Sequence, residues 1–505
     1  MITFISCLAI LIIGYFVYGT YVDKNAKLSD DNQTPAVRLE DGVDYMPMPW
    51  YKVFLIQFLN IAGTGPIFGA IMGALFGPVA FLWITFGTIF AGGVHDYLSG
   101  VISMKHDGTS VSEIVGIYLG DGMKKVMRVF SVILLILVGT VFVTSPAGLL
   151  TSMTGIDKNI WVVLIIIYYI VATVLPVDKV IGKIYPIFGA SLLFMAIGLA
   201  GAMIIGHFNG SMVMPEMTLQ NLHPSGLSIF PFLFTTIACG ALSGFHSTQS
   251  PMMARCINRE SESKRVFYGA MVVEGIVALI WCAVTIAFFG ESGVIQSALD
   301  SFGGQSGVVS HISKELLGPI GAVLAVLGVV ACPITSGDTA FRSARLTIAD
   351  AFNIKQDGLL SRFKLAIPLF AVCVFLTTID FNIIWRYFAW SNQTLATIFL
   401  WTATVYLIKN EANYWISLIP ATFMSSVCVS YILQAPEGFR LNAMFSNGVG
   451  VVAAIVLFVL FMLNKNKFVK NKDSKNIFAP NGADIVSAVE AKVVVTDTTA
   501  YDLEL

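Results

Sequence analysis

Long apolar segments separated by short polar ones dominate this chain. Thirteen of the apolar segments have roughly 18 to 27 residues, enough for helices that cross about 30 Å of hydrocarbon at 1.5 Å per residue. The pattern therefore predicts an all-α, polytopic membrane protein with about thirteen transmembrane helices. The predicted helices cover approximately residues 2–22, 52–76, 78–104, 129–150, 159–176, 184–206, 228–253, 266–289, 317–341, 365–380, 384–408, 413–433 and 443–463.

Two of these segments contain sequences that interrupt a helix. The first is Gly63-Thr64-Gly65-Pro66, in which proline removes a backbone N–H and the glycines lack side chains that favour helical torsions. The second runs from Gly240 to Pro251. An interrupted helix within a bilayer must be buried in protein or line a cavity, and such helices bind cargo in secondary transporters. We expect the two interruptions to face each other near the membrane midplane.

The positions of the two interruptions indicate an inverted repeat. Each interruption falls in the first helix of a five-helix unit, and the two units have opposite orientations. A proline-bearing segment also recurs in the third helix of each unit, at 144–146 and at 332–338. The predicted division is a first transmembrane helix and loop at 1–49, repeats at 50–227 and 228–410, two additional helices at 411–464 and a cytoplasmic tail at 465–505.

Composition and charge narrow the class further. The chain is 56% hydrophobic and 12% charged, against about 25% charged in soluble domains. Loops on one side of the predicted topology carry 26 of the 30 Lys and Arg residues, so the N-terminus is expected outside and the C-terminus in the cytoplasm. We expect a multi-pass protein of the cell membrane, whose partners are the lipid bilayer and a small molecule rather than nucleic acid. The oligomeric state stays open.

The presence of ionisable residues within apolar segments needs an explanation, because their burial in a membrane costs free energy. His95 and Asp96 are candidates for a proton site, with Glu274 as their counterpart in the second repeat; partnered structural roles are the alternative. Thr335, Ser336 and Asp338 offer oxygen ligands for a cation, or hydroxyls that bond backbone freed by a proline. The seven cysteines show no metal-ligand spacing, so neither a metal site nor a cofactor is expected beyond a coupling ion, H⁺ or Na⁺.

Helix N-termini at the two interruptions would meet a substrate carboxylate with free N–H groups. Polar side chains near them are the candidates for substrate contact, although amides in such helices often only join one helix to another. His246 has the further alternative of a packing residue. The candidate substrate-binding residues are Gln57, Asn60, Gly63, Thr64, Gly65, His246, Ser247, Gln249, Asn392 and Gln393.

Several separated motifs together resemble the carbon starvation protein A (CstA) family over about residues 50–400. The chain departs from the family pattern at Ile56 and Gln57, where many members have histidines, and at His95, where many have glutamine. If the histidines of other members bind substrate or carry a proton, this chain lacks that role at these positions, and His95 is a candidate to replace the titrating group. The matching segments are IAGTGPIFGA at 61–70, AGGVHDYLSG at 91–100, HDGTS at 106–110, SGDTAFRSARLTIAD at 336–350 and FAWSNQTLA at 388–396.

The resemblance implies a membrane transporter for small nutrients, with peptides and pyruvate as the associated substrates. It also implies a five-plus-five inverted-repeat core of the LeuT and amino acid–polyamine–organocation type. Our expectation is a secondary active transporter that imports a small carboxylate-bearing nutrient together with H⁺ or Na⁺. The alternatives are a passive channel or a membrane enzyme, and we expect no enzyme because no nucleophile–base or metal-protease motif is found.

Overall fold

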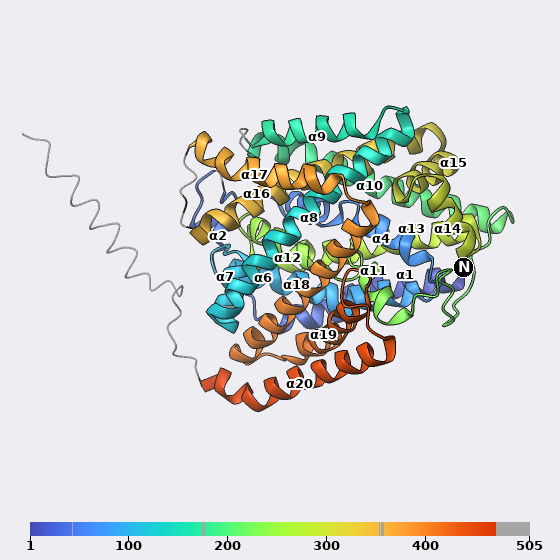
Figure 1. The fold of residues 1–505 in the computed structure, drawn as a ribbon. Helices are drawn as coiled ribbons and strands as arrows, with labels where there is room; N and C mark the ends of the chain where they lie inside the picture. Colours follow the sequence, from blue (N-terminus) through green and yellow to red (C-terminus); the bar gives the residue numbers. More distant parts are fainter. Residues whose placement is uncertain (43, 174–176, 353, 355–357, 471–505) are drawn as a thin grey trace, which may run out of the picture.

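The chain forms a bundle of helices in the computed structural model, which describes residues 1–42, 44–173, 177–352, 354 and 358–470. Most long helices lie side by side, with α2 and α7 at one end of the bundle and α14 and the N-terminus at the other (Figure 1). The helices are α1 (Ile2–Asn25), α2 (Pro35–Arg38), α3 (Trp50–Ala62), α4 (Gly65–Ala74), α5 (Ala80–Leu82), η1 (Trp83–Gly92), α6 (Gly93–Lys105), α7 (Val111–Leu119), α8 (Asp121–Thr154), α9 (Lys158–Ala172), α10 (Val177–Phe208), η2 (Ile229–Leu233), α11 (Phe234–Thr236), α12 (Gly244–Ala254), η3 (Glu260–Glu262), η4 (Lys264–Tyr268), α13 (Gly269–Phe289), α14 (Ser292–Ser301), α15 (Gln305–Ala325), η5 (Val326–Ala331), α16 (Cys332–Phe352), α17 (Leu359–Thr377), α18 (Phe381–Lys409), α19 (Trp415–Gln434) and α20 (Ala443–Lys470).

The architecture is that of an all-helical membrane protein, as predicted. Eight helices in the described part of the chain are long and apolar enough to cross a membrane, and the bent pair α3 and α4 makes a ninth. One of the eight is α17, which confirms a helix at the shortest predicted segment, 365–380. Four other predicted segments coincide with shorter or more polar helices, at 78–104, 159–176, 228–253 and 384–408.

Both predicted interruptions are present. The first separates α3 from α4 with a bend of 47°, and Gly63 adopts φ +40° there, a torsion that side-chain-bearing residues rarely take. The second lies between α11 and α12, where Ile237 to Ser243 leave the helical path and Gly240 has φ +90°. The predicted extension of this break to Pro251 is wrong, because Pro251 lies inside α12, where the helix accommodates it.

Packing between the predicted repeats is reciprocal. The interrupted helix of the first unit, α3 with α4, packs on α13 of the second. In turn α12 packs on α6 of the first unit, and the third helices α8 and α16 pack on each other. The additional helices α19 and α20 pack together beside α18. Within the predicted tail, residues 465–470 belong to α20, and residues 471–505 lie outside the described residues, as does Lys355.

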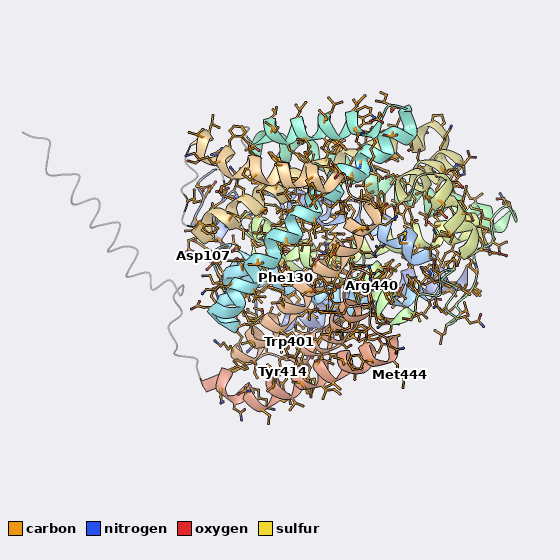
Figure 2. The ribbon with its side chains drawn as sticks, in the orientation of Figure 1. Asp107, Phe130, Trp401, Tyr414, Arg440 and Met444 are labelled. Atoms are coloured by element: carbon orange, nitrogen blue, oxygen red, sulfur yellow. The ribbon has the colours of Figure 1, made fainter. Side chains whose placement is uncertain are left out.

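The segment between α1 and α3, described for residues 26–42 and 44–49, forms a strap across the α2 and α7 end of the bundle. The Thr34 hydroxyl donates to the Ile257 carbonyl at 2.7 Å, and Arg38 forms an ion pair with Asp107. The place of Asp107 at this end can be followed in Figure 2. The strap thereby joins the turn after α6 to the loop after α12.

The loops at the other end of the bundle also contact one another. The N-terminal ammonium group lies 2.6 Å from the Glu216 carboxylate in the loop after α10. Arg386 at the start of α18 pairs with Glu437 at 3.1 Å, in the loop after α19. Loops that the thirteen-helix topology assigns to the same side of the membrane therefore meet at the same end of the molecule.

Candidate functional site

The two interrupted helices touch where each one breaks. A Cβ atom placed on Gly65 would lie 2.4 Å from the Cβ of Cys239, and one on Gly240 would lie 3.4 Å from Pro66. A Cβ on Gly63 would lie 2.5 Å from the ring of Phe142 on α8. The glycines therefore allow a close approach of the two breaks that no larger residue would permit.

Four buried ionisable side chains form a continuous chain beside this contact. Asp96 on α6 accepts from His95 Nδ1 and, through its other oxygen, from His246 Nδ1, both at 2.8 Å. His246 on α12 then turns its Nε2 toward a Glu274 oxygen on α13, 3.4 Å away. All four side chains are completely buried. The structure therefore unites His95, Asp96 and Glu274, and adds His246, which we expected among the substrate contacts.

This buried chain has two chemical capacities. Histidines that alternate with carboxylates can pass a proton along a line of hydrogen bonds. The 3.4 Å separation of His246 Nε2 and Glu274 is longer than a normal hydrogen bond, so a proton shared there needs a small approach of the two groups. The Cys239 sulfur also lies within 4.8 Å of the nearest ligand atoms of both residues, a set that could hold a metal ion. No ligand spacing in the sequence indicates this set.

The backbone of the second break is held by side chains from neighbouring helices. Trp83 Nε1 donates to the Ile237 carbonyl at 3.1 Å, and the Thr88 hydroxyl donates to the Gly240 carbonyl at 2.9 Å. The Gln393 amide donates to the Leu242 carbonyl at 3.1 Å. Backbone groups freed by the break are thus satisfied inside the protein, as a buried interruption requires.

Asn392 caps the start of α12. Its Oδ1 accepts from the backbone N–H of Phe245 at 2.7 Å, and its amide donates to the Ser243 hydroxyl at 3.0 Å. The Ser247 hydroxyl instead donates to the Gly244 carbonyl of its own helix at 2.7 Å. Asn392, Gln393 and Ser247 therefore act in this structure as partners of the protein backbone.

Three buried amides on α3 and α12 have side-chain atoms without a hydrogen-bond partner in the described part of the chain. Gln57 on α3 is completely buried, and neither end of its side-chain amide meets a partner among the described residues. Within the same described part, the side-chain oxygens of Asn60 and Gln249 are also buried without a partner. Buried polar groups are almost always hydrogen-bonded, so these three amides are available to a bound molecule or water.

The predicted cation ligands on α16 separate into two groups. The Ser336 hydroxyl donates to the Leu59 carbonyl at 3.3 Å and so reaches the last turns of α3. The Thr335 hydroxyl donates to the Cys332 carbonyl of its own helix at 2.8 Å. Asp338 lies 3.5 Å from Arg342 and lines a separate small cavity with Arg345. The structure brings Ser336 to the first break but not Asp338.

A large cavity opens at the end of the bundle that carries the N-terminus. It has a volume of about 690 Å³ and is lined by residues that include Thr144, Ser145, Lys158, Gln305 and Arg386. The Ser145 hydroxyl donates to the Thr64 hydroxyl at 3.3 Å. The cavity therefore reaches the layer of residues next to the first break, and its volume is typical of sites that hold small molecules.

The lining residues of the cavity were not among the predicted substrate contacts. Thr144 and Ser145 belong to the proline-bearing segment of the third helix, which the sequence marked only as part of the repeat. The remaining lining comes from loops and helix ends far apart in the chain. None of the ten predicted substrate residues is among the lining residues, and they lie deeper, around the two breaks.

Comparison with known proteins identifies the family. The sequence profile described as "Carbon starvation protein CstA" matches residues 1–156 and 144–308. The chain belongs to the CstA family. It is therefore a protein of a transporter family and not an enzyme.

Three relatives show how the chain relates to other CstA-family proteins. An "uncharacterized membrane protein" of Haemophilus influenzae is 44% identical over 60% of this chain and 95% of its own length. The "Peptide transporter CstA" of Bacillus subtilis is 31% identical over 63% of each chain. The "Pyruvate/proton symporter BtsT" of Escherichia coli is 26% identical over 57% of this chain and 49% of its own.

Solved structures place the CstA-family fold among LeuT-fold transporters. A Na⁺-coupled sialic acid symporter aligns with a TM-score of 0.54 and 15% identity, over 91% of this chain and 97% of that one. A manganese transporter of Eremococcus coleocola aligns with a TM-score of 0.52 and 13% identity, over 85% and 99%. At this identity the likeness concerns the fold alone.

Proposed function

We propose that this protein is a secondary active transporter that imports small carboxylate-bearing nutrients, pyruvate or short peptides, with an inward proton. The observation that carries the proposal is the cavity of about 690 Å³, whose Ser145 hydroxyl donates to Thr64 in the first break. A substrate in this cavity would need only one layer of side chains to shift before it reached the N-terminus of α4. Free N–H groups there would bind its carboxylate.

The deeper substrate site is proposed at the two breaks. Gly63, Thr64 and Gly65 supply backbone groups, and Gln57, Asn60 and Gln249 supply buried amides with unused capacity. The cavity lining carries Lys158 and Arg386 but also Asp300 and Asp380, so the proposed preference for a carboxylate depends on the N–H groups at the first break rather than on the charge of the cavity. His246, Ser247, Asn392 and Gln393 shape the second break, and their contact with substrate would be indirect.

We assign thirteen membrane passes, with the N-terminus outside and the C-terminus in the cytoplasm. The reciprocal packing of α3, α4 and α12 with α13 and α6 supports repeats at 50–227 and 228–410. The meeting of alternate loops at opposite ends of the bundle supports the count. The excess of Lys and Arg in the loops at the strap end supports the orientation.

The proposed coupling element is the chain His95, Asp96, His246 and Glu274. It links α6 of the first repeat to α12 and α13 of the second, and α12 begins at the second break. A proton that arrives or leaves would change the charge that holds these three helices together. Whether the proton is bound would thereby decide which of two arrangements of the breaks is favoured, one open to the outside and one open to the cytoplasm.

A second candidate for the coupling ion is Na⁺, carried by a different observation. The Ser336 hydroxyl faces the Leu59 carbonyl at 3.3 Å, close to the end of α3. Hydroxyl and carbonyl oxygens of this kind are suitable ligands for a hard cation. Thr335 and Asp338 would contribute only after a rearrangement of α16.

The test is uptake into proteoliposomes that contain the purified protein. Labelled pyruvate and a labelled dipeptide are each offered under an imposed H⁺ gradient, an imposed Na⁺ gradient and neither. We expect accumulation of one of the two with the H⁺ gradient, and counterflow of labelled for unlabelled substrate without any gradient. Flux without counterflow would contradict a transporter and support a channel. The zinc content of the purified protein is measured as well. One bound zinc ion per chain that is lost in Cys239→Ala would contradict the proton role of His246 and Glu274.

A further inference from the structure

A second, apolar groove lies between α18, α19 and α20, on the side of the bundle away from the interrupted helices. Its volume is about 500 Å³, and its lining includes Ile398, Trp401, Leu460 and Phe461. Figure 2 shows Trp401 on the part of the bundle next to α20. This groove is separate from the cavity and from the breaks, so the proposed function makes no use of it.

The polar residues of the groove do not offer their groups to a ligand. The Thr394 and Thr397 hydroxyls donate to carbonyls of their own helix at 2.9 and 2.8 Å. Trp401 Nε1 donates to the Ser425 hydroxyl at 3.0 Å, and the Asn464 amide donates to the Leu460 carbonyl at 2.8 Å. The groove therefore presents an apolar surface, which suits a hydrocarbon chain better than a polar solute.

The extent of the groove corresponds to one leaflet of a bilayer. Along α20 the lining runs from Leu457 to Phe468, about 16 Å at 1.5 Å per residue. This is about half of the ~30 Å hydrocarbon core. Leu457 lies in the middle of α20, whereas Phe468 lies at the end where the strap is. The groove thus begins near the midplane and opens at that end.

Positive charge surrounds the open end. Lys465 and Lys467 lie between the lining residues Asn464 and Phe468, and Lys125 lies two residues after the lining residue Met123 on α8. Lys124 is paired with the carboxylate of Glu113. By contrast, none of the other three lysines forms an ion pair within the described part of the chain. An apolar groove with free ammonium groups at its mouth is complementary to a lipid with a negative headgroup.

We propose that this groove binds an anionic phospholipid, with an acyl chain between α18 and α20 and the phosphate at Lys465 and Lys467. The lipid would fill the space beside α20, whose only extensive packing is on α19. Its headgroup would fix the end of α20 at the membrane surface. The inference depends on the membrane-spanning fold and not on the substrate or the coupling ion.

The experiment measures quenching of Trp401 by brominated lipids in vesicles. The protein is reconstituted in phosphatidylcholine that contains either brominated phosphatidylglycerol or brominated phosphatidylcholine. The signal of Trp401 is the difference between the wild type and Trp401→Phe. We expect stronger quenching by phosphatidylglycerol. In Lys465→Gln/Lys467→Gln the preference should fall about fivefold for each lysine, because each contributes about 1 kcal/mol near an anionic surface.

The matched control is Lys52→Gln, which removes an exposed lysine at the same end of the bundle but on α3. It should leave the preference unchanged. Equal quenching by the two lipids, or a preference that survives the double substitution, would overturn the proposal. Absence of quenching by both lipids, together with a dimer in mass photometry, would also overturn it and would assign the groove to a second copy of the chain.

Discussion

The first and second breaks differ in the hydrogen-bond partners that surround them. At the second break, carbonyls freed from the helix accept from Trp83, Thr88 and Gln393, and Asn392 caps the helix that follows. Beside the first break, Ser336 and Cys332 reach the Leu59 carbonyl, whereas both ends of the Gln57 amide and the Asn60 side-chain oxygen have no partner among the described residues. The second break thus has more side-chain partners for its backbone, and more unpaired amide atoms lie beside the first, where we propose that substrate binds. Interrupted helices of similar sequence character can therefore differ in how far neighbouring side chains bond their freed backbone.

The largest effect is expected where the two breaks touch. Gly65→Leu places a side chain where a Cβ alone would lie 2.4 Å from Cys239, so the breaks must separate and uptake should be abolished. Thermal unfolding in detergent checks that the variant is folded. Gly201→Leu is the control, since a Cβ there meets nothing within 4 Å, and it should transport normally. Wild-type uptake by Gly65→Leu would refute the site.

The next largest effect is expected on proton coupling through the buried ionisable side chains beside the second break. Asp96→Asn removes the charge that accepts from both His95 and His246, so uptake should no longer follow an H⁺ gradient although exchange persists. One charge carried across 100 mV supplies about 2.3 kcal/mol, so roughly fiftyfold accumulation should disappear. Asp338→Asn is the matched control, because its partner is Arg342. Proton-driven accumulation by Asp96→Asn would show that the chain is structural.

A direct test of the comparison substitutes one amide at each break. Asn392→Ala leaves the Phe245 N–H and the Ser243 hydroxyl without their partner. The free energy of unfolding should therefore fall by about 1–3 kcal/mol. Gln57→Leu removes an amide that has no described partner, so stability should stay equal or rise while substrate affinity falls. Both quantities are measured by thermal unfolding with and without substrate. If Gln57→Leu lost stability and Asn392→Ala lost substrate affinity instead, the roles proposed for the two breaks would be reversed.

The smallest effect lies outside the membrane-spanning segments, at Glu113 on α7. Burial opposes its ionisation, but Lys124 and Arg128 together lower the pKa of Glu113 below its usual value. A lowered pKa contributes stability that is present at neutral pH and is lost as the pH falls through the folded-state pKa. Glu113→Gln should therefore reduce stability at pH 7 by about 1 kcal/mol or less. Its difference from the wild type in thermal unfolding should vanish in acid.

The sequence predicts the fold well because the relevant signals are local. Apolar length marks helices, and Gly63 to Pro66 mark the first break through torsions and a missing N–H. Pro251 shows the limit of this reasoning, since it sits inside α12 and the break lies before it. A proline alone does not determine where a buried helix opens, because neighbouring side chains decide which backbone groups can be satisfied.

The candidate site was harder to predict because tertiary packing assembles it. His246 is 150 residues from Asp96 in the sequence, and no spacing rule joins them. Glu274 was predicted as the counterpart of Asp96, and the structure places both at the same histidine. The hydroxyls of α16 are close in the sequence, yet Thr335 bonds its own helix and Ser336 reaches the Leu59 carbonyl on α3. Closeness in the sequence therefore does not determine which of these residues share a partner.

The strap gives the two ends of the molecule different freedom to open. At the strap end, the Thr34 hydroxyl donates to the Ile257 carbonyl, Arg38 forms an ion pair with Asp107, and the backbone N–H of Met48 donates to the Cys256 carbonyl at 3.0 Å. At the opposite end, the large cavity already reaches Ser145, which bonds Thr64 in the first break. Opening at the strap end must break these ties, so we expect release there to be slower than loading. The turnover rate would then be limited by how often the strap's hydrogen bonds and ion pair break. Substrate exchange from the cavity side would be faster than net import.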